Sequence, residues 1–211
     1  MVNKKLFVIT LILTILVFIA GVSVGLGLDY FRIKDVSNSF EKDRLDIESF
    51  IVEQQLLSSL EDKGCSVLKD RVSELSKSTY ETGSTLEKYE SVGYSNREYN
   101  LLKRENIILK VRLIQALDYL KNNCGENEHI ILFFYERNNN DCVKQGYVLD
   151  ELNKEENYKY NIFAFDSKFK EEPLISMLNK EYDIKEVPTL IVDGFKKEGY
   201  TSTGELKAIL K

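Results

Sequence analysis

The sequence predicts an α/β domain at its C-terminal end, preceded by an all-α segment and by an apolar N-terminal helix. Residues 129–211 alternate short β-branched and aromatic runs with stretches of helical spacing, which is typical of α/β folds. Residues 29–123 contain no proline and repeat apolar residues at helical spacing. Residues 6–28 contain no charged residue. We therefore expect three parts, residues 1–28, 29–127 and 128–211.

The elements expected in residues 128–211 follow the order β-α-β-α-β-β-α. The first strand, 130–135, is a run of Ile, Leu, Phe and Tyr that suits a buried strand. Residues 142–154 place apolar side chains at helical spacing and form the first helix. Asp193-Gly194 is a turn signal between the last two strands. The other expected elements are a strand at 160–165, a helix at 172–182, strands at 189–192 and 195–199, and a helix at 201–211.

Two short motifs in this part of the chain stand at the ends of predicted strands. The run Asn139-Asn140-Asp141-Cys142 lies between the first strand and the first helix, and Val187-Pro188 directly precedes the third strand. Together with the order of elements, these motifs make residues 128–211 resemble the thioredoxin-like family. The resemblance places Cys142 on the second cysteine of the family's Cys-x-x-Cys pair and Asn139 on the first. It also implies that Val187-Pro188 is the cis-proline motif opposite this loop.

The sequence departs from the family at the positions that dithiol chemistry uses. Dithiol exchange needs an attacking thiolate and a second thiol that resolves the mixed disulfide, and Asn139 cannot attack. Phe133 stands where the family has a buried proton-relaying acid, and Asn138 stands where it has an aromatic residue. We therefore expect a domain that binds a protein partner, or serves as a structural module, without electron transfer. The residues expected at its partner-binding loop are Asn139, Asn140, Asp141, Cys142, Val187 and Pro188.

Cys142 leaves an alternative function open. A thiol near a helix N-terminus can have a lowered pKa and be reactive, and the domain would then be a single-cysteine thiol-disulfide oxidoreductase acting through Cys142. A partly buried thiol kept for packing is the interpretation that the family position favours. A second alignment makes Cys142 the first residue of Cys-Val-Lys-Gln and requires a longer loop before it.

Residues 6–28 predict a transmembrane signal-anchor. At 1.5 Å per residue this uncharged stretch would form about 34 Å of helix, which is enough for a hydrocarbon core of about 30 Å. Lys4 and Lys5 precede it, so the positive-inside rule leaves the N-terminus in the cytoplasm and the bulk of the chain outside. A cleaved signal peptide is the alternative, although its apolar region is usually shorter. We expect a single-pass protein of the cell membrane.

Residues 29–127 predict a helical stalk with a coiled-coil-like repeat. A first helix is expected at about 29–62, and a hairpin of two more helices follows it, with Gly93 at the tip. Ser95-Asn96-Arg97-Glu98 has the pattern of a capping box that starts the third helix. Packing within one chain is the favoured use of the apolar stripes, and a homo-oligomer through the stalk is the alternative. The stripe of the second helix consists of Leu68, Val72, Leu75, Thr79, Thr82, Leu86 and Tyr89.

Two cysteines stand at the open end of this hairpin. Cys65 opens the second helix and Cys124 closes the third. An antiparallel hairpin brings both to the same level, because the two helices have similar lengths of about 42 and 45 Å at helical rise. A Cys65–Cys124 disulfide is therefore feasible, and an extracytoplasmic compartment would permit it. Two neighbouring but unpaired thiols are the alternative.

The other polar residues predict no further site. The net charge of −5 argues against a nucleic-acid partner, which favours clustered basic residues. His129 is the single histidine and is expected at the surface. No metal-ligand cluster is seen in the sequence, so no metal and no cofactor is expected. The charged run Lys103-Arg104-Glu105 is expected on a solvated helix face.

Overall fold

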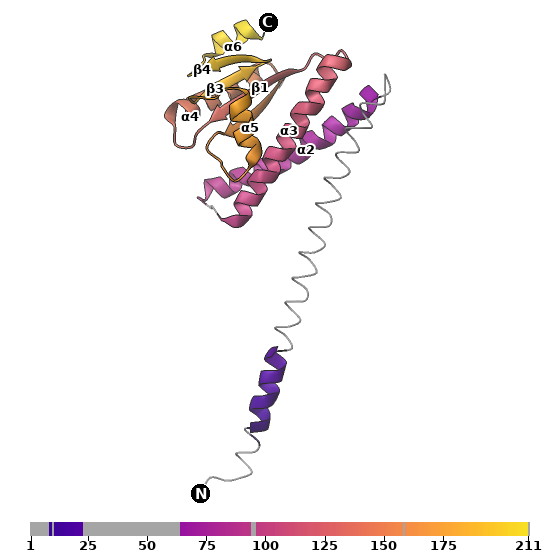
Figure 1. The fold of residues 1–211 in the computed structure, drawn as a ribbon, viewed down its shortest axis with the longest axis vertical. Helices are drawn as coiled ribbons and strands as arrows, with labels where there is room; N and C mark the ends of the chain where they lie inside the picture. The colour runs from indigo at the N-terminus through magenta and orange to yellow at the C-terminus, as the bar shows by residue number, and fades with distance from the viewer. Residues whose placement is uncertain (1–8, 10, 23–63, 94–95, 158, 211) are drawn as a thin grey trace. The chain divides into compact units, whose positions relative to one another are not determined.

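The computed structural model describes residues 9, 11–22, 64–93, 96–157 and 159–210 (Figure 1). The chain has two compact units, Met1–Glu61 and Asp62–Lys211. In the first unit, residues 11–22 are helical and exposed. Among the described residues, no helix combines the length and the apolar character that crossing a membrane requires. The predicted anchor, 6–28, extends beyond the described residues, and the predicted first helix of the stalk, 29–62, lies outside them.

The second unit follows the predicted order of helices and strands. Local signals explain several element starts. Pro173 begins a helix, where its missing N–H needs no partner, and Ser202 forms a capping box with Glu205. The helices are α2 (Gly64–Ser91), α3 (Arg97–Asn123), α4 (Asn140–Glu155), α5 (Pro173–Glu181) and α6 (Thr203–Ile209), and the strands are β1 (His129–Tyr135), β2 (Tyr160–Asp166), β3 (Thr189–Val192) and β4 (Phe195–Glu198).

The strands form a mixed four-stranded sheet in the order β2-β1-β3-β4. β1 and β2 are parallel and are connected through α4, whereas β3 is antiparallel to both β1 and β4. Phe133 is in register with Ala164 on β2 and with Leu190 on β3. This arrangement confirms the predicted α/β class and the predicted order β-α-β-α-β-β-α for the C-terminal part of the chain.

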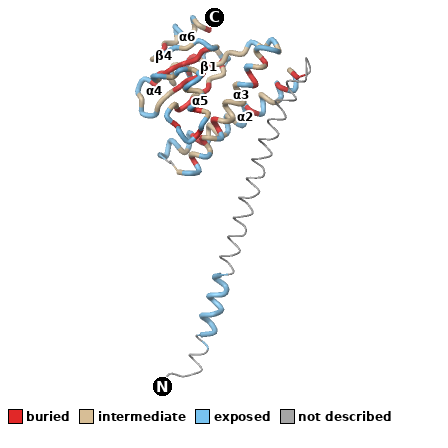
Figure 2. The backbone as a smooth tube through the Cα atoms, viewed as in Figure 1, coloured by how far each residue is buried: buried red, intermediate tan, exposed pale blue. Residues whose placement is uncertain are grey.

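Helices cover both faces of the sheet, because successive side chains of each strand point to opposite faces. Phe134 and Phe165 lie on the face covered by α3 and α5, with ring centroids 5.8 Å apart. Figure 2 shows buried positions concentrated in the strands and along one side of the helices. The core on the α4 and α6 side consists of Ile131, Phe133, Cys142, Leu149, Leu152, Tyr160, Leu190, Val192, Leu206 and Leu210.

α2 and α3 form the predicted hairpin. α3 begins with Asn96 as its N-cap, one residue after the start of the predicted capping box, and the Asn96 side chain accepts a hydrogen bond from Tyr99 N at 2.8 Å. The polar positions of the apolar stripe also pair across the hairpin. Asn106 Nδ2 donates to Thr79 O at 3.0 Å and to Thr82 Oγ1 at 2.7 Å. The buried apolar members of the α2 stripe are Leu68, Leu75 and Leu86.

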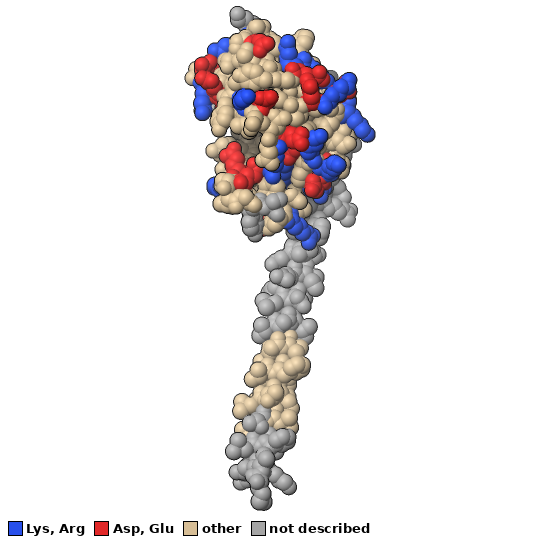
Figure 3. All heavy atoms as spheres, turned by 90° about the vertical axis from the view of Figure 1, so that its left-hand side faces the viewer, with Lys and Arg blue, Asp and Glu red and all other residues tan. Residues whose placement is uncertain are grey.

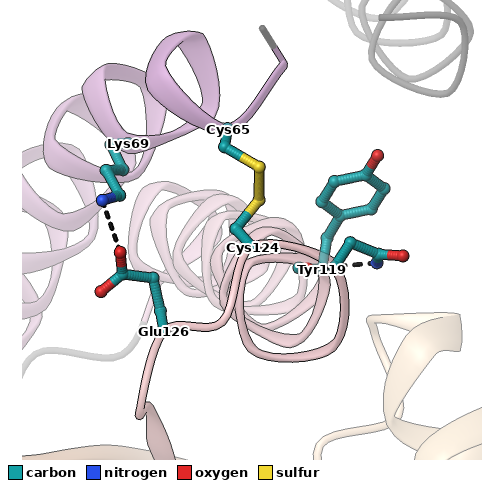
Figure 4. The surroundings of a disulfide bond; sticks show 6 residues. Cys65, Lys69, Tyr119, Cys124 and Glu126 are labelled. Atoms are coloured by element: carbon teal, nitrogen blue, oxygen red, sulfur yellow. Dashed lines mark hydrogen bonds and ion pairs between the residues drawn. A yellow bond between two sulfur atoms is a disulfide. The ribbon is translucent and has the colours of Figure 1, made fainter. Parts of the chain in front are cut away.

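A disulfide closes the open end of the hairpin, as predicted. Cys65 and Cys124 are bonded with their Cα atoms 5.7 Å apart and a sequence separation of 59. Figure 4 shows the bond between the first turn of α2 and the end of α3, with the ion pair of Lys69 and Glu126 beside it. The hairpin is therefore tied covalently at one end and continuous through its loop at the other.

α3 packs on the sheet as well as on α2. Lys110 Nζ donates to Ala164 O of β2 at 3.0 Å, and Lys121 Nζ donates to Asp193 Oδ1 at 2.8 Å. Burial, followed by the nearby charge of Lys103, lowers the pKa of Lys110 to about 8. The predicted boundary between residues 127 and 128 therefore lies within one compact unit, Asp62–Lys211.

The expectation that residues 103–105 form a solvated face is wrong for Lys103. Its side chain is buried, and Nζ lies 2.6 Å from Asp166 Oδ2 at the end of β2. Arg104 also turns toward the α/β domain, where its Nε lies 3.2 Å from Glu172 Oε2. α3 lies between α2 and the sheet, so its charged residues meet partners on a surface that an isolated stalk would leave in water.

Candidate functional site

The first turn of α4 holds the predicted site loop. Asn139, at the position of the missing cysteine, is the N-cap of α4. Its Oδ1 accepts hydrogen bonds from Asp141 N at 2.9 Å and from Cys142 N at 3.1 Å. These are N–H groups that the helix itself leaves without partners. Asn139 therefore performs a capping role and offers no group that could attack a disulfide.

Cys142 is a free thiol that is 4% exposed and belongs to the core under α4. Burial raises the pKa of Cys142 above its ordinary value, and the carboxylates of Glu136 and Asp141 act in the same direction. A backbone hydrogen bond at Glu136 opposes these effects. Since the thiolate is the reactive form of cysteine, this environment favours the packing interpretation over a reactive thiol.

Val187 and Pro188 lie beside this loop. The peptide bond between them is cis, as predicted. Val187 packs against the same core cluster as Cys142, and Pro188 is buried. Pro188 O accepts a hydrogen bond from Gly199 N at 2.8 Å, which joins the segment after β4 to the site. The predicted site residues are thus brought together from two separate parts of the chain.

Exposed apolar side chains border the site loop on α4. Val143 is 53% exposed and Tyr147, one turn further along the helix, is 71% exposed. Tyr200 is also exposed, and its neighbour Thr201 exchanges two hydrogen bonds with Gln145 of α4, at 2.7 and 3.1 Å. We call Val143, Tyr147 and Tyr200 the apolar border. Figure 3 views the molecule from the side on which α4 lies in Figure 1, where acidic and basic side chains are interspersed among uncharged ones.

A polar pocket of about 300 Å³ opens on the other side of the loop. Its walls come from the segments that follow β1 and β2, from α5, and from the segment before Pro188. Asn139 and Val187 contribute to it, so the pocket is continuous with the predicted site. The other lining residues are Glu136, Ser167, Lys168, Asn179, Ile184, Lys185 and Glu186.

Sequence reasoning missed a group of charged residues behind this pocket. The buried pair of Lys103 and Asp166 lies at the centre of this group of charged residues. Arg137, in the loop after β1, pairs with Glu90 of α2, and its Nε lies 3.7 Å from Asp166 Oδ2. Burial, followed by the carboxylates of Asp166 and Glu90, raises the pKa of Tyr135 well above its usual value and keeps the phenol neutral. No local sequence pattern links these residues, because they are far apart in the chain.

His129 does not lie free at the surface, contrary to expectation. Its side chain is largely buried, and Nδ1 lies 2.7 Å from Asp193 Oδ2 in the turn between β3 and β4. Hydrogen bonds from Lys121 and His129 contribute to a lowered pKa of Asp193, against the effect of burial. Within the part of the chain that the structure describes, no group of three or more His, Cys, Asp or Glu residues is placed to hold a metal ion.

Comparison with known proteins adds a likeness of fold. No protein-family model and no curated protein matches the chain. Thioredoxin-2, a component of the malaria parasite protein secretion machinery, is 21% identical over 40% of this chain and 82% of its own, with a TM-score of 0.35. Chloroplastic thioredoxin z is 16% identical over 46% and 85%, with a TM-score of 0.36. Oxidised thioredoxin from Plasmodium falciparum is 20% identical over 40% and 79%, with a TM-score of 0.32.

The thioredoxin-like character of the domain rests on its own geometry. The order of elements β-α-β-α-β-β-α, the cis bond before Pro188 and the position of Cys142 in the first turn of α4 are those that the resemblance implies.

Proposed function

We propose that the α/β domain binds a partner polypeptide at the face formed by residues 139–142, Val187-Pro188 and the apolar border, without dithiol exchange. The observation that carries this proposal is the use of Asn139. Its side chain caps α4 by binding the N–H groups of Asp141 and Cys142. The position that would carry an attacking thiol is thereby given to a structural role, while the surrounding surface remains available for contact.

The chemistry of the face favours an extended polypeptide with aromatic or aliphatic side chains. Tyrosine is enriched at protein interfaces, because its ring contributes a large contact area and its hydroxyl a hydrogen bond. Tyr147 and Tyr200 offer such side chains next to the loop. The adjoining pocket is polar and carries both signs of charge, from Glu136, Glu186 and the lysines at 168 and 185. A peptide with apolar anchors and polar flanks would match both surfaces.

We also propose that the domain is displayed on the extracytoplasmic side of a membrane, with residues 6–28 as the signal-anchor. The uncharged length of that segment and the preceding Lys4 and Lys5 support this orientation. The Cys65–Cys124 bond supports an oxidising compartment. Protease treatment of intact cells tests the display, since removal of residues 62–211 supports it and full protection contradicts it.

Cys142 is expected to resist alkylation in the folded protein. Iodoacetamide reacts with the thiolate, and burial together with the raised pKa keeps the thiolate fraction and its exposure low. Mass spectrometry of the full chain in detergent micelles, labelled first when native and then when denatured and reduced, measures this. We expect labelling of native Cys142 to be at least about a hundredfold slower than in the denatured chain, which corresponds to about 2.7 kcal/mol of protection.

The alkylation experiment has one comparison variant and one outcome that contradicts the proposal. The Asn139→Cys variant recreates a Cys-x-x-Cys pair and is expected to form a second disulfide with Cys142 under mild oxidation. Labelling of native wild-type Cys142 as fast as in the denatured chain would contradict the proposal. It would support instead the alternative in which Cys142 forms a mixed disulfide with a partner thiol.

Replacing Tyr147 with alanine is expected to weaken peptide binding by at least about fivefold, because truncating a side chain that contributes to an interface costs about 1 kcal/mol or more. The probe is a library of unstructured 12-residue peptides, and fluorescence anisotropy of the full chain in micelles measures the affinity. Tyr80→Ala is the matched control, because Tyr80 is similarly exposed, at 76% against 71% for Tyr147, but lies on α2. Equal effects of the two substitutions, or no binding by the wild-type chain, would refute the binding face.

A further inference from the structure

We propose that the end of the α2–α3 hairpin holds this site in place. Glu90 and Lys103 are positioning residues for the two loops that line the pocket. The functional meaning of this inference rests on the proposed binding face. The loops are residues 136–139, which follow β1, and residues 167–169, which follow β2. The hairpin lies outside the sheet, yet its side chains reach the base of both loops.

The two loops begin at the same edge of the sheet. β1 and β2 are parallel, and Tyr135 is in register with Asp166, so both strands end together. Ser167 N and Oγ both donate to Tyr135 O, at 2.9 and 3.1 Å. Lys168 N donates to Asp166 Oδ1 at 3.2 Å. A group that holds the Asp166 side chain in place therefore also holds the beginning of the second loop. Through the hydrogen bonds of Ser167, it holds the end of β1 as well.

Lys103 of α3 is that group. Its Nζ lies 2.6 Å from Asp166 Oδ2, and both side chains are only 8% exposed. The same ammonium lies 4.5 Å from the ring centroid of Phe169, a buried residue of the second loop. At such low exposure a charge pair is weakly screened by solvent. Lys103 thus holds the second loop by a charge contact and by a cation–π contact.

Glu90 of α2 acts on the first loop through Arg137. Tyr99 OH donates to Glu90 Oε1 at 2.7 Å, which orients the carboxylate that pairs with Arg137. The Arg137 guanidinium also lies 5.2 Å from the ring centroid of Tyr99 and near Asp166. Arg137 is therefore surrounded by hairpin residues on one side and by the end of β2 on the other, two residues before Asn139.

Amide hydrogen exchange of the full chain in micelles, without any partner, tests the inference. In Glu90→Gln we expect exchange over residues 136–139 to rise roughly two- to fivefold, the range expected for a half-exposed ion pair. Lys103→Gln should raise exchange over both loops by more than about tenfold, since that pair is buried. Lys103→Arg, which keeps the charge, should restore values near those of the wild type. Glu87→Gln, the same charge change one turn earlier on α2, should leave both loops unchanged.

Two results would overturn the inference. One is unchanged loop exchange in Glu90→Gln and Lys103→Gln. The other is a rise in Glu90→Gln that is equally large across α4 and α6, because that pattern reports a general loss of stability rather than release of the loops. If Lys103→Gln does not fold, loop exchange in Arg137→Gln and in Glu90→Gln tests the inference instead. Since exchange is read without a peptide, failure of the binding proposal and failure of this inference give different results.

Discussion

Replacing Lys103 with methionine is expected to lower the free energy of unfolding by about 3 to 5 kcal/mol, the loss typical when one partner of a buried ion pair is removed. The substitution leaves the Asp166 carboxylate with the Lys168 amide and with Arg137, whose Nε is 3.7 Å away. These contacts do not replace an ammonium 2.6 Å from Oδ2. Urea denaturation of the full chain in micelles, followed by circular dichroism, measures the change.

The double variant Lys103→Met/Asp166→Asn separates the loss of the pair from the cost of an unpaired charge. It removes both charges but keeps a side-chain oxygen for the Lys168 amide. We expect it to recover at least half of the loss, because replacing both partners of a buried pair is often close to neutral. A Lys103→Met variant within about 1 kcal/mol of the wild type would mean that the pair behaves like a solvated one.

Removing the Cys65–Cys124 bond is expected to lower the free energy of unfolding by about 4 kcal/mol. In the chain-entropy account, the stabilisation depends on the length of the closed loop. The sequence separation of 59 gives that figure. The variant Cys65→Ser/Cys124→Ser removes the bond and leaves Cys142 unchanged. Urea denaturation under non-reducing conditions compares it with the wild type.

Reduction and a neighbouring substitution provide the controls for this bond. A reducing agent should cost the wild type the same free energy as the double serine variant and should leave that variant unchanged. Lys69→Met removes the ion pair beside the bond, whose side chains are 53% and 37% exposed, and should cost less than about 1 kcal/mol. Equal stability of the wild type and the double variant would show that the hairpin is held by its packing alone.

The features that the sequence predicted correctly depend on local patterns. The hairpin and its disulfide follow from helical rise and from cysteines at matching ends of two helices. The strands follow from short β-branched and aromatic runs between turn signals. Each of these is governed by backbone hydrogen bonding or side-chain period within a few residues.

The tertiary structure alone decided which polar and charged residues pair across the fold. Lys103 and Asp166 are separated by 63 positions, and His129 and Asp193 by 64, so no periodicity connects them. A lysine on a helix normally faces water, and only packing reveals otherwise. α3 lies between α2 and the sheet, and a helix between two layers has too little solvent-facing surface for all its charges. Those that turn inward must find partners there, because an unpaired charge in the interior is costly.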